Sequence, residues 1–205
     1  MNVFKLLPQD HSQIITTTIY SMSKAFENTK TLVLDLDETL ISSSMIKPDS
    51  FDFSVPIVME GIEYDVFVRK RPGCDDLLEF ASKNYHLYFF TSSLPQYANT
   101  IIDILIPGFP HDRVLTRKYC DFVNGSYIKN LRHFHSSLSS IIIIDDKASS
   151  FVFNQSNGIP ITSWTGDYSD TQLSNFIIPF LNDCLPMKDV RFEIAKFKQR
   201  NRHFS

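Results

Sequence analysis

Short apolar runs alternate along the chain with segments of helical spacing, and this alternation predicts the architecture. The apolar runs that read as strands are Thr31–Leu34, His86–Phe90, Arg113–Leu115, Ile141–Asp145 and Ile159–Ile161. The segments with apolar residues on one helical face are Asp75–Lys83, Tyr97–Leu105 and Thr171–Asn182. Strands that alternate with helices favour a doubly wound α/β fold, in which helices cover both faces of a parallel sheet.

A second pattern follows the first predicted strand. From Phe51 to Lys70, β-branched and aromatic residues alternate with polar ones around Glu60-Gly61, which predicts a small β-hairpin flap with glycine at its turn. The segment between this hairpin and the strand at His86 is too short for a large cap domain. We therefore expect a crevice that is open to a bulky partner.

Composition narrows the class of protein. With 205 residues, 43% hydrophobic and 21% charged, the chain suits one globular domain. Its 20 basic residues against 23 acidic ones give a net charge of -3, so the composition does not predict nucleic-acid binding. The cysteines Cys74, Cys120 and Cys184 lie far apart, which favours reduced thiols in a nuclear or cytoplasmic protein.

No apolar stretch predicts a membrane span. The longest aliphatic run, Ile141–Ile144, is far too short. The N-terminal residues, which include Lys5, Pro8 and Asp10, lack the long apolar segment of a secretory signal. We expect a soluble monomer that does not bind membranes.

The strongest candidate for chemistry is Asp35-Leu36-Asp37-Glu38-Thr39-Leu40, which follows the first apolar run directly. Side chains alternate along a strand, so Asp35 and Asp37 point the same way. Two carboxylates at this spacing suit a cation. They also suit covalent chemistry, in which Asp35 attacks phosphorus and Asp37 handles protons. The alternative is an ordinary acidic turn after an apolar strand.

Further polar residues are candidates for binding phosphate. Thr91 and Ser92 come after His86–Phe90 and before a helix, where hydroxyl and backbone N–H groups bind phosphate well. Lys129 offers a charge that can neutralise a phosphate. Taken singly, Thr91 also suits a strand-end cap and Lys129 a solvated surface charge.

Two adjacent acids, Asp145 and Asp146, end the Ile141–Ile144 run. Burial of that strand places carboxylates where their charge must be compensated, and a metal ion compensates it. The carboxyl ends of parallel strands meet in one crevice. Mg²⁺ prefers oxygen ligands, which Asp35, the main-chain carbonyl of Asp37 and Asp146 can supply together with water.

Taken together, these motifs resemble the haloacid dehalogenase superfamily and, more narrowly, the small phosphatases of the RNA polymerase II carboxy-terminal domain (CTD), the FCP/SCP-like or NLI-interacting-factor group. The likeness runs from Lys30 to Phe192. Besides the aspartate motif, it rests on Val55-Pro56, Lys70-Arg71-Pro72-Gly73, Phe90-Thr91-Ser92-Ser93-Leu94, Tyr127-Ile128-Lys129 and Ile159-Pro160-Ile161-Thr162-Ser163-Trp164.

The resemblance implies roles for single residues. The catalytic pair is Asp35, the nucleophile, and Asp37, the general acid and base. The implied ligands of Mg²⁺ are Asp35, Asp37 and Asp146, with Asp145 in support. The implied phosphate contacts are Thr91, Ser92 and Lys129. The implied substrate contacts are Arg117, Tyr97 and Met45.

The sequence differs from the small CTD phosphatases at two places, and these differences bear on the choice of substrate more than on the reaction. Where the small CTD phosphatases have Asp-Asn-Ser-Pro, this chain has Asp145-Asp146-Lys147-Ala148. Where they carry an aromatic that pairs with a tyrosine to hold a substrate proline, this chain has Met45 beside the matching Tyr97. Methionine fills an apolar slot adaptably, but proline-directed specificity does not follow from it.

The resemblance therefore implies a Mg²⁺-dependent phosphoserine/phosphothreonine protein phosphatase, with a phosphoprotein substrate such as the RNA polymerase II CTD. It divides the chain into a lead-in, residues 1–29, that is compatible with a helix, a phosphatase domain, residues 30–192, and a basic tail, residues 193–205. Two alternatives remain: a non-catalytic peptide-binding module of the same fold, and a small-metabolite phosphatase of the same superfamily.

Overall fold

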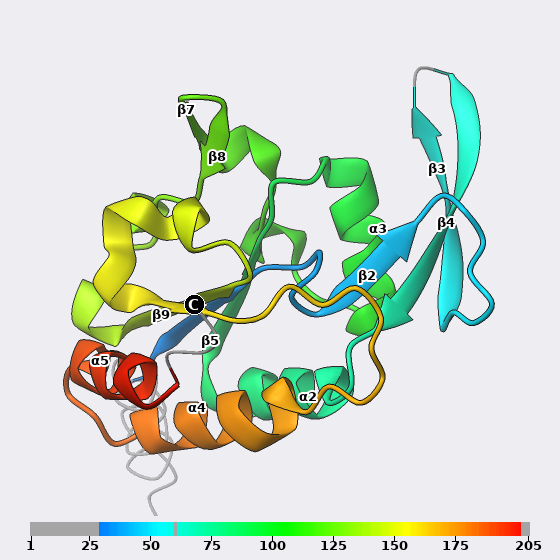
Figure 1. Ribbon diagram of the computed structural model, residues 1–205. Helices are drawn as coiled ribbons and strands as arrows, with labels where there is room; N and C mark the ends of the chain where they lie inside the picture. Colours follow the sequence, from blue (N-terminus) through cyan, green and yellow to red (C-terminus); the bar gives the residue numbers. More distant parts are fainter. Residues whose placement is uncertain (1–28, 60, 202–205) are drawn as a thin grey trace, which may run out of the picture.

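The computed structural model describes residues 29–59 and 61–201 and confirms the doubly wound α/β fold. Within these residues the central sheet is parallel, in the order β10-β9-β1-β5-β6 (Figure 1). Its strands are β1 (Thr31–Leu34), β5 (His86–Phe90), β6 (Val114–Leu115), β9 (Ile141–Asp145) and β10 (Gly158–Pro160). The predicted lead-in lies outside the described residues except for Thr29.

Strand β1 lies at the centre of this sheet. Thr31 is opposite His86 of β5 on one side and Ile141 of β9 on the other. All four residues of β1 are buried, because neighbouring strands flank both of its edges and packed layers cover both of its faces. The carboxyl ends of β1, β5 and β9 therefore lie side by side at one edge of the sheet.

Side-chain alternation along β1 assigns its residues to two packed layers. Leu32 and Leu34 pack with the core residues of four α-helices, whereas Val33 packs on the other face with Leu131 and Phe151. The helices are α2 (Cys74–Asn84), α3 (Pro95–Leu105), α4 (Ile178–Cys184) and α5 (Val190–Arg200). The Val33 face is covered by short 3₁₀ segments, among them Leu131–His133 and Ala148–Asn157.

Several predicted elements differ in detail from the sequence pattern, and two of the differences have a local cause. The expected helix Thr171–Asn182 consists of a π-helical turn, Leu173–Ile177, that continues into α4. Pro179 has no N–H to donate to the preceding turn, and this accounts for the widened turn before it. The expected strand Arg113–Leu115 begins one residue later, because Arg113 ends a short 3₁₀ turn.

The predicted hairpin is present and forms an antiparallel flap in the order β2-β4-β3. Its strands are β2 (Ile41–Ser44), β3 (Phe53–Met59) and β4 (Ile62–Lys70). Val55 pairs with Val66 across the hairpin, and Gly61 adopts a φ of 80° at its turn. The pattern did not predict β2, which joins the flap directly to the aspartate motif. Figure 1 shows the flap projecting from the side of the sheet.

Helix α5 crosses the predicted boundary between domain and tail. It begins at Val190 and ends at Arg200, and its Asp189 N-cap accepts a hydrogen bond from the backbone N–H of Arg191. Val190 and Ile194 are buried in the main core, while Arg200 is exposed. Residues up to Arg200 thus pack on the domain. No helix in the described ranges is long and apolar enough to cross a membrane.

Candidate active site

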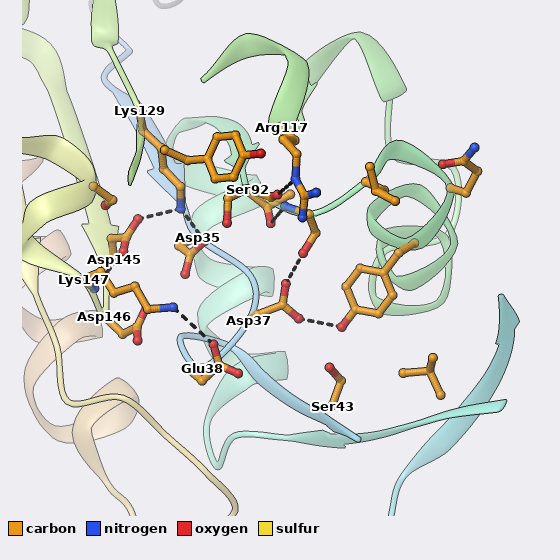
Figure 2. A pocket seen from close by; sticks show the side chains of 18 of the residues that line it. Asp35, Asp37, Glu38, Ser43, Ser92, Arg117, Lys129, Asp145, Asp146 and Lys147 are labelled. Atoms are coloured by element: carbon orange, nitrogen blue, oxygen red, sulfur yellow. Dashed lines mark hydrogen bonds and ion pairs between the residues drawn. The ribbon is translucent and has the colours of Figure 1, made fainter. Parts of the chain in front are cut away.

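All ten predicted site residues line one pocket of about 600 Å³ at the carboxyl edge of the central sheet (Figure 2). Asp35 follows β1, Thr91 follows β5, and Asp145 ends β9, so the strand order brings them together. The remaining predicted residues in the lining are Asp37, Met45, Ser92, Tyr97, Arg117, Lys129 and Asp146.

Lys129 lies between two carboxylates at the base of the pocket. Its Nζ donates to Oδ1 of Asp35 and, at 2.6 Å, to Oδ2 of Asp145. The side chain of Lys129 is 3% exposed and that of Asp145 is 1% exposed. Lys129 is thus a buried charge, which excludes a solvated surface role. Two carboxylates and one ammonium group leave this cluster with one excess negative charge.

The cluster shifts the pKa of Asp35 and that of Lys129. Burial and the neighbouring charge of Asp145 raise the pKa of Asp35 to about 7, against the opposing effect of Lys129. Burial alone would lower the pKa of Lys129, but Asp145 and Asp35 outweigh it and raise that pKa. Lys129 therefore stays charged, and the excess negative charge favours a cation beside Asp35.

Thr39, a residue with no role in the sequence interpretation, links the two acidic loops. Its hydroxyl donates to Oδ2 of Asp35 at 2.8 Å and accepts the backbone N–H of Asp146 at 3.1 Å. The guanidinium group of Arg71 donates to the Thr39 carbonyl and pairs with both carboxylate oxygens of Asp170. The local sequence carries no signal for this network, because its members come from four separate segments.

Replacing Arg71 with methionine should lower the free energy of unfolding by about 3–5 kcal/mol, because Asp170 and the Thr39 carbonyl lose a buried partner. The side chain of Arg71 is 0% exposed. Arg132→Met is the matched control, because its pair with Asp121 is largely exposed and worth at most about 1 kcal/mol. Urea denaturation measures both variants, and equal losses would contradict the assigned role of Arg71.

Asp37 accepts hydrogen bonds through both carboxylate oxygens. The Ser93 hydroxyl donates to Oδ2 at 2.7 Å and the Tyr97 hydroxyl to Oδ1 at 2.5 Å. Burial and the charge of Asp37 raise the pKa of Tyr97, so this hydroxyl remains a donor. Figure 2 shows the Asp37 side chain pointing away from Asp35, so the expectation that the two point the same way is wrong. Strand β1 ends at Leu34, and strand alternation does not extend over Asp35 and Asp37. Ser93 was not among the predicted site residues.

Thr91 and Ser92 lie where β5 leads into α3. Thr91 is buried and its Oγ1 accepts the backbone N–H of Ser93 at 3.0 Å, which is the cap that its position also suggested. A hydroxyl that accepts in this way keeps its own hydrogen to donate to a phosphoryl oxygen. The Ser92 carbonyl accepts from Nε of Arg117 at 2.6 Å.

Arg117 packs against a two-stranded hairpin, β7 (Asp121–Val123) and β8 (Ser126–Ile128). Its guanidinium carbon lies 5.1 Å from the centre of the Tyr127 ring. Strand β8 leads directly into Lys129 and thereby positions it. This hairpin was not predicted, although its turn, Asn124-Gly125 with φ of 49° and 81°, is a strong sequence signal.

The donor set fits a hard divalent cation. Carboxylate oxygens of Asp35, Asp145 and Asp146 lie within 4.8 Å of one another, and Oδ1 of Asp146 is buried without a hydrogen-bond partner. Asp145 already accepts from Lys129 and from the backbone N–H of Lys147. Asp35 likewise accepts from Lys129 and from Thr39, so Oδ1 of Asp146 is the oxygen of this set without a partner. Asp35 and Asp146 remain the side chains expected to hold Mg²⁺. Burial raises the pKa of Asp146, and a bound cation would relieve this cost.

An apolar wall forms the opposite side of the pocket. Its residues come from the flap and from α3: Met45, Ile57, Val58, Val66, Leu94 and Tyr97. Met45 is 55% exposed, so the predicted departure from an aromatic residue lies at an open, accessible position. The pocket thus joins an acidic base to an apolar wall that is accessible from outside.

Comparison with known proteins identifies this arrangement. Residues 30–191 match the NLI interacting factor-like phosphatase family. The chain belongs to this family. The match confirms the resemblance drawn from the sequence motifs, and it covers nearly the same residues as the predicted phosphatase domain.

Named relatives of this NLI interacting factor-like chain are similar over most of its length. A Dictyostelium discoideum protein named "Probable C-terminal domain small phosphatase" is 41% identical over 162 residues, 79% of this chain and 53% of the relative. A human "CTD small phosphatase-like protein" is 36% identical over 161 residues, 78% of this chain and 58% of the relative. The chain thus spans little more than half the length of these relatives.

The fold also resembles a solved structure. Fission yeast RNA polymerase II CTD phosphatase Fcp1, bound to beryllium fluoride, has a TM-score of 0.57 at 19% identity, and the match covers 92% of this chain and 58% of that one. At this identity the likeness supports the fold alone.

Proposed function

We propose that this chain is a Mg²⁺-dependent phosphoserine/phosphothreonine protein phosphatase that acts through an aspartyl-phosphate intermediate on Asp35. The observation that carries the proposal is the environment of the Asp35 carboxylate. Its carboxylate is held by Lys129 and Thr39 at the base of an open pocket, with Asp146 beside it. Family membership and relatives that are named as phosphatases support the same reaction.

The first step transfers the phosphoryl group to the enzyme. An oxygen of Asp35 attacks phosphorus, the bond between phosphorus and the seryl or threonyl oxygen breaks, and that oxygen takes a proton from Asp37. Lys129 and Thr91 neutralise and hydrogen-bond the phosphoryl oxygens. Mg²⁺ held by Asp35 and Asp146, with the Asp37 carbonyl as the third expected ligand, would offset the negative charge that collects there.

The second step restores the enzyme. Asp37, now a carboxylate, takes a proton from water as the water oxygen attacks phosphorus, and the bond between phosphorus and Asp35 breaks. Phosphate leaves and Asp35 is again a free carboxylate. The second step requires water to reach the phosphorylated residue, which the open pocket allows.

The shape of the pocket favours a phosphoprotein over a small metabolite, because the flap provides an accessible apolar wall and no large cap encloses the acidic base in the described residues. A further human relative is named "Carboxy-terminal domain RNA polymerase II polypeptide A small phosphatase 1". This name makes the CTD of RNA polymerase II the first substrate to test, and such a substrate would place the protein in the nucleus. Arg117, Tyr97 and Met45 are the proposed contacts to the peptide.

The proposal is tested by hydrolysis of p-nitrophenyl phosphate with Mg²⁺ and with a chelator, for the wild type and for Asp146→Asn. The wild type should turn over only with Mg²⁺. Asp146→Asn should require at least about tenfold more Mg²⁺, because a ligand that lacks charge binds the cation more weakly.

Turnover that resists the chelator would contradict the role of the metal. A folded wild type that hydrolyses neither p-nitrophenyl phosphate nor phosphopeptides would instead indicate a peptide-binding module. Rapid hydrolysis of sugar phosphates or nucleotides without activity on phosphopeptides would indicate a small-metabolite phosphatase.

A further inference from the structure

We propose that Tyr97 and Ser93 are positioning residues that hold the carboxyl group of Asp37 and thereby couple the apolar wall of the pocket to proton transfer. The inference rests on the proposed function, because it assigns these residues a part in that reaction. It starts from the two hydrogen bonds to Asp37, at 2.5 Å from Tyr97 and 2.7 Å from Ser93.

The two donors fix the orientation of the carboxyl group. One hydrogen bond would leave the group free to rotate about the bond that joins it to Cβ, whereas donors on both oxygens leave it one orientation. Because general acid catalysis requires the proton within hydrogen-bond reach of the leaving oxygen, a carboxyl group that rotates freely is a poorer acid. Holding Asp37 in one orientation is thus a contribution to rate.

The donors are themselves rigidly placed. Ser93 lies in the turn before α3, and Tyr97 lies in the first turn of that helix. The helix is fixed in the core through Ala98, Ile101 and Ile102, which are fully buried. The orientation of Asp37 is therefore tied to the body of the domain, although Asp37 itself lies in a loop.

Tyr97 also faces the other part of the pocket. Its ring packs against the main core and lines the pocket together with Met45 and Val66. A substrate side chain seated on this wall would contact the ring whose hydroxyl holds Asp37. A different substrate side chain on this wall should therefore alter the rate of the chemical step as well as the affinity for the substrate.

Substrates with different leaving groups distinguish a positioning role of Tyr97 and Ser93 from a role in substrate binding alone. A seryl oxygen is strongly basic and needs the proton of Asp37 as its bond to phosphorus breaks. The aryl oxygen of p-nitrophenyl phosphate is a good leaving group and needs little such help. Loss of positioning should thus slow hydrolysis of a phosphoserine peptide far more than hydrolysis of the aryl phosphate.

The test compares Tyr97→Phe and Ser93→Ala with the wild type on both substrates, through kcat/KM, which reports the first phosphoryl transfer. Tyr97→Phe keeps the ring and removes only the hydroxyl. We expect kcat/KM for the phosphoserine peptide to fall about tenfold or more, with KM little changed, and kcat/KM for the aryl phosphate to fall less than about threefold. Ser93→Ala should act in the same direction.

Thr100→Ala is the control on the same helix, because Thr100 does not line the pocket and its hydroxyl donates to a backbone carbonyl, that of Gln96. It should match the wild type on both substrates, and thermal unfolding should show that all variants fold. Equal losses on both substrates in Tyr97→Phe, or a change confined to KM, would overturn the inference while leaving the proposed function intact. Absence of hydrolysis by the wild type would overturn both.

Discussion

Replacing Asp35 with asparagine should abolish phosphatase activity and make the metal-free protein more stable. Turnover should fall by at least about 10⁴-fold, because asparagine cannot form the aspartyl phosphate. Stability should rise because the substitution removes one of two buried carboxylates that share Lys129 and leaves the neutral Lys129–Asp145 pair.

The stability that Asp35→Asn gains over the wild type should increase as the pH rises. Folding raises the pKa of Asp35 to about 7, whereas the unfolded chain titrates near about 3.9. The wild type therefore loses stability as the pH rises from about 4 to about 7, since folding then requires proton uptake on Asp35. The advantage of the variant should be complete above about pH 7 and disappear below about pH 4.

Thermal unfolding with chelator across this pH range measures the effect, beside p-nitrophenyl phosphate hydrolysis with Mg²⁺. Asp121→Asn is the matched control, because Asp121 lies outside the pocket and its partner Arg132 is largely exposed. It should leave both quantities nearly unchanged. A variant at Asp35 that keeps full activity would exclude the assigned nucleophile.

Replacing Lys129 with methionine should have the opposite effect on stability and the same effect on activity. The substitution leaves Asp35 and Asp145 as buried carboxylates without their shared cation, which should cost about 3–5 kcal/mol above about pH 7. It also removes the charge that would neutralise the phosphoryl group, so turnover should fall by about 10²-fold or more.

The double variant Lys129→Met with Asp145→Asn tests the cause of this loss. Removing one of the two stranded carboxylates should restore a large part of the stability, although activity should stay low. Urea denaturation above about pH 7 with chelator compares the single and double variants. If the double variant is less stable than the single one, charge imbalance is not what destabilises Lys129→Met.

The fold and the acidic base of the pocket could be predicted because the strands of the central sheet are recognisable in the sequence. Apolar runs such as Ile141–Ile144 mark strands buried on both faces, and a parallel sheet brings their carboxyl ends together. Residues directly after such strands, including Asp35 and Thr91, could therefore be placed in one crevice from the sequence alone.

The network that supports these residues could not be placed in the same way. Thr39, Arg71 and Asp170 meet through hydrogen bonds between segments far apart in the chain, and hydrophobic periodicity carries no information on such partners. The contact of Ser93 with Asp37 escaped prediction for the same reason. Lys129 illustrates a related limit, because its sequence neighbours do not show whether its charge is solvated or buried.

The direct connection of β2 to the aspartate motif makes residues 41–70 an exchangeable unit. Strand β2 leaves the domain immediately after Leu40, and the backbone N–H of Arg71 returns to the Leu40 carbonyl at 2.9 Å. The segment therefore departs from and rejoins the domain at neighbouring points. Grafting the corresponding segment from a relative should exchange the part of the apolar wall that the flap supplies, while Tyr97 and Arg117 stay in place, provided that the graft keeps both ends of this closure.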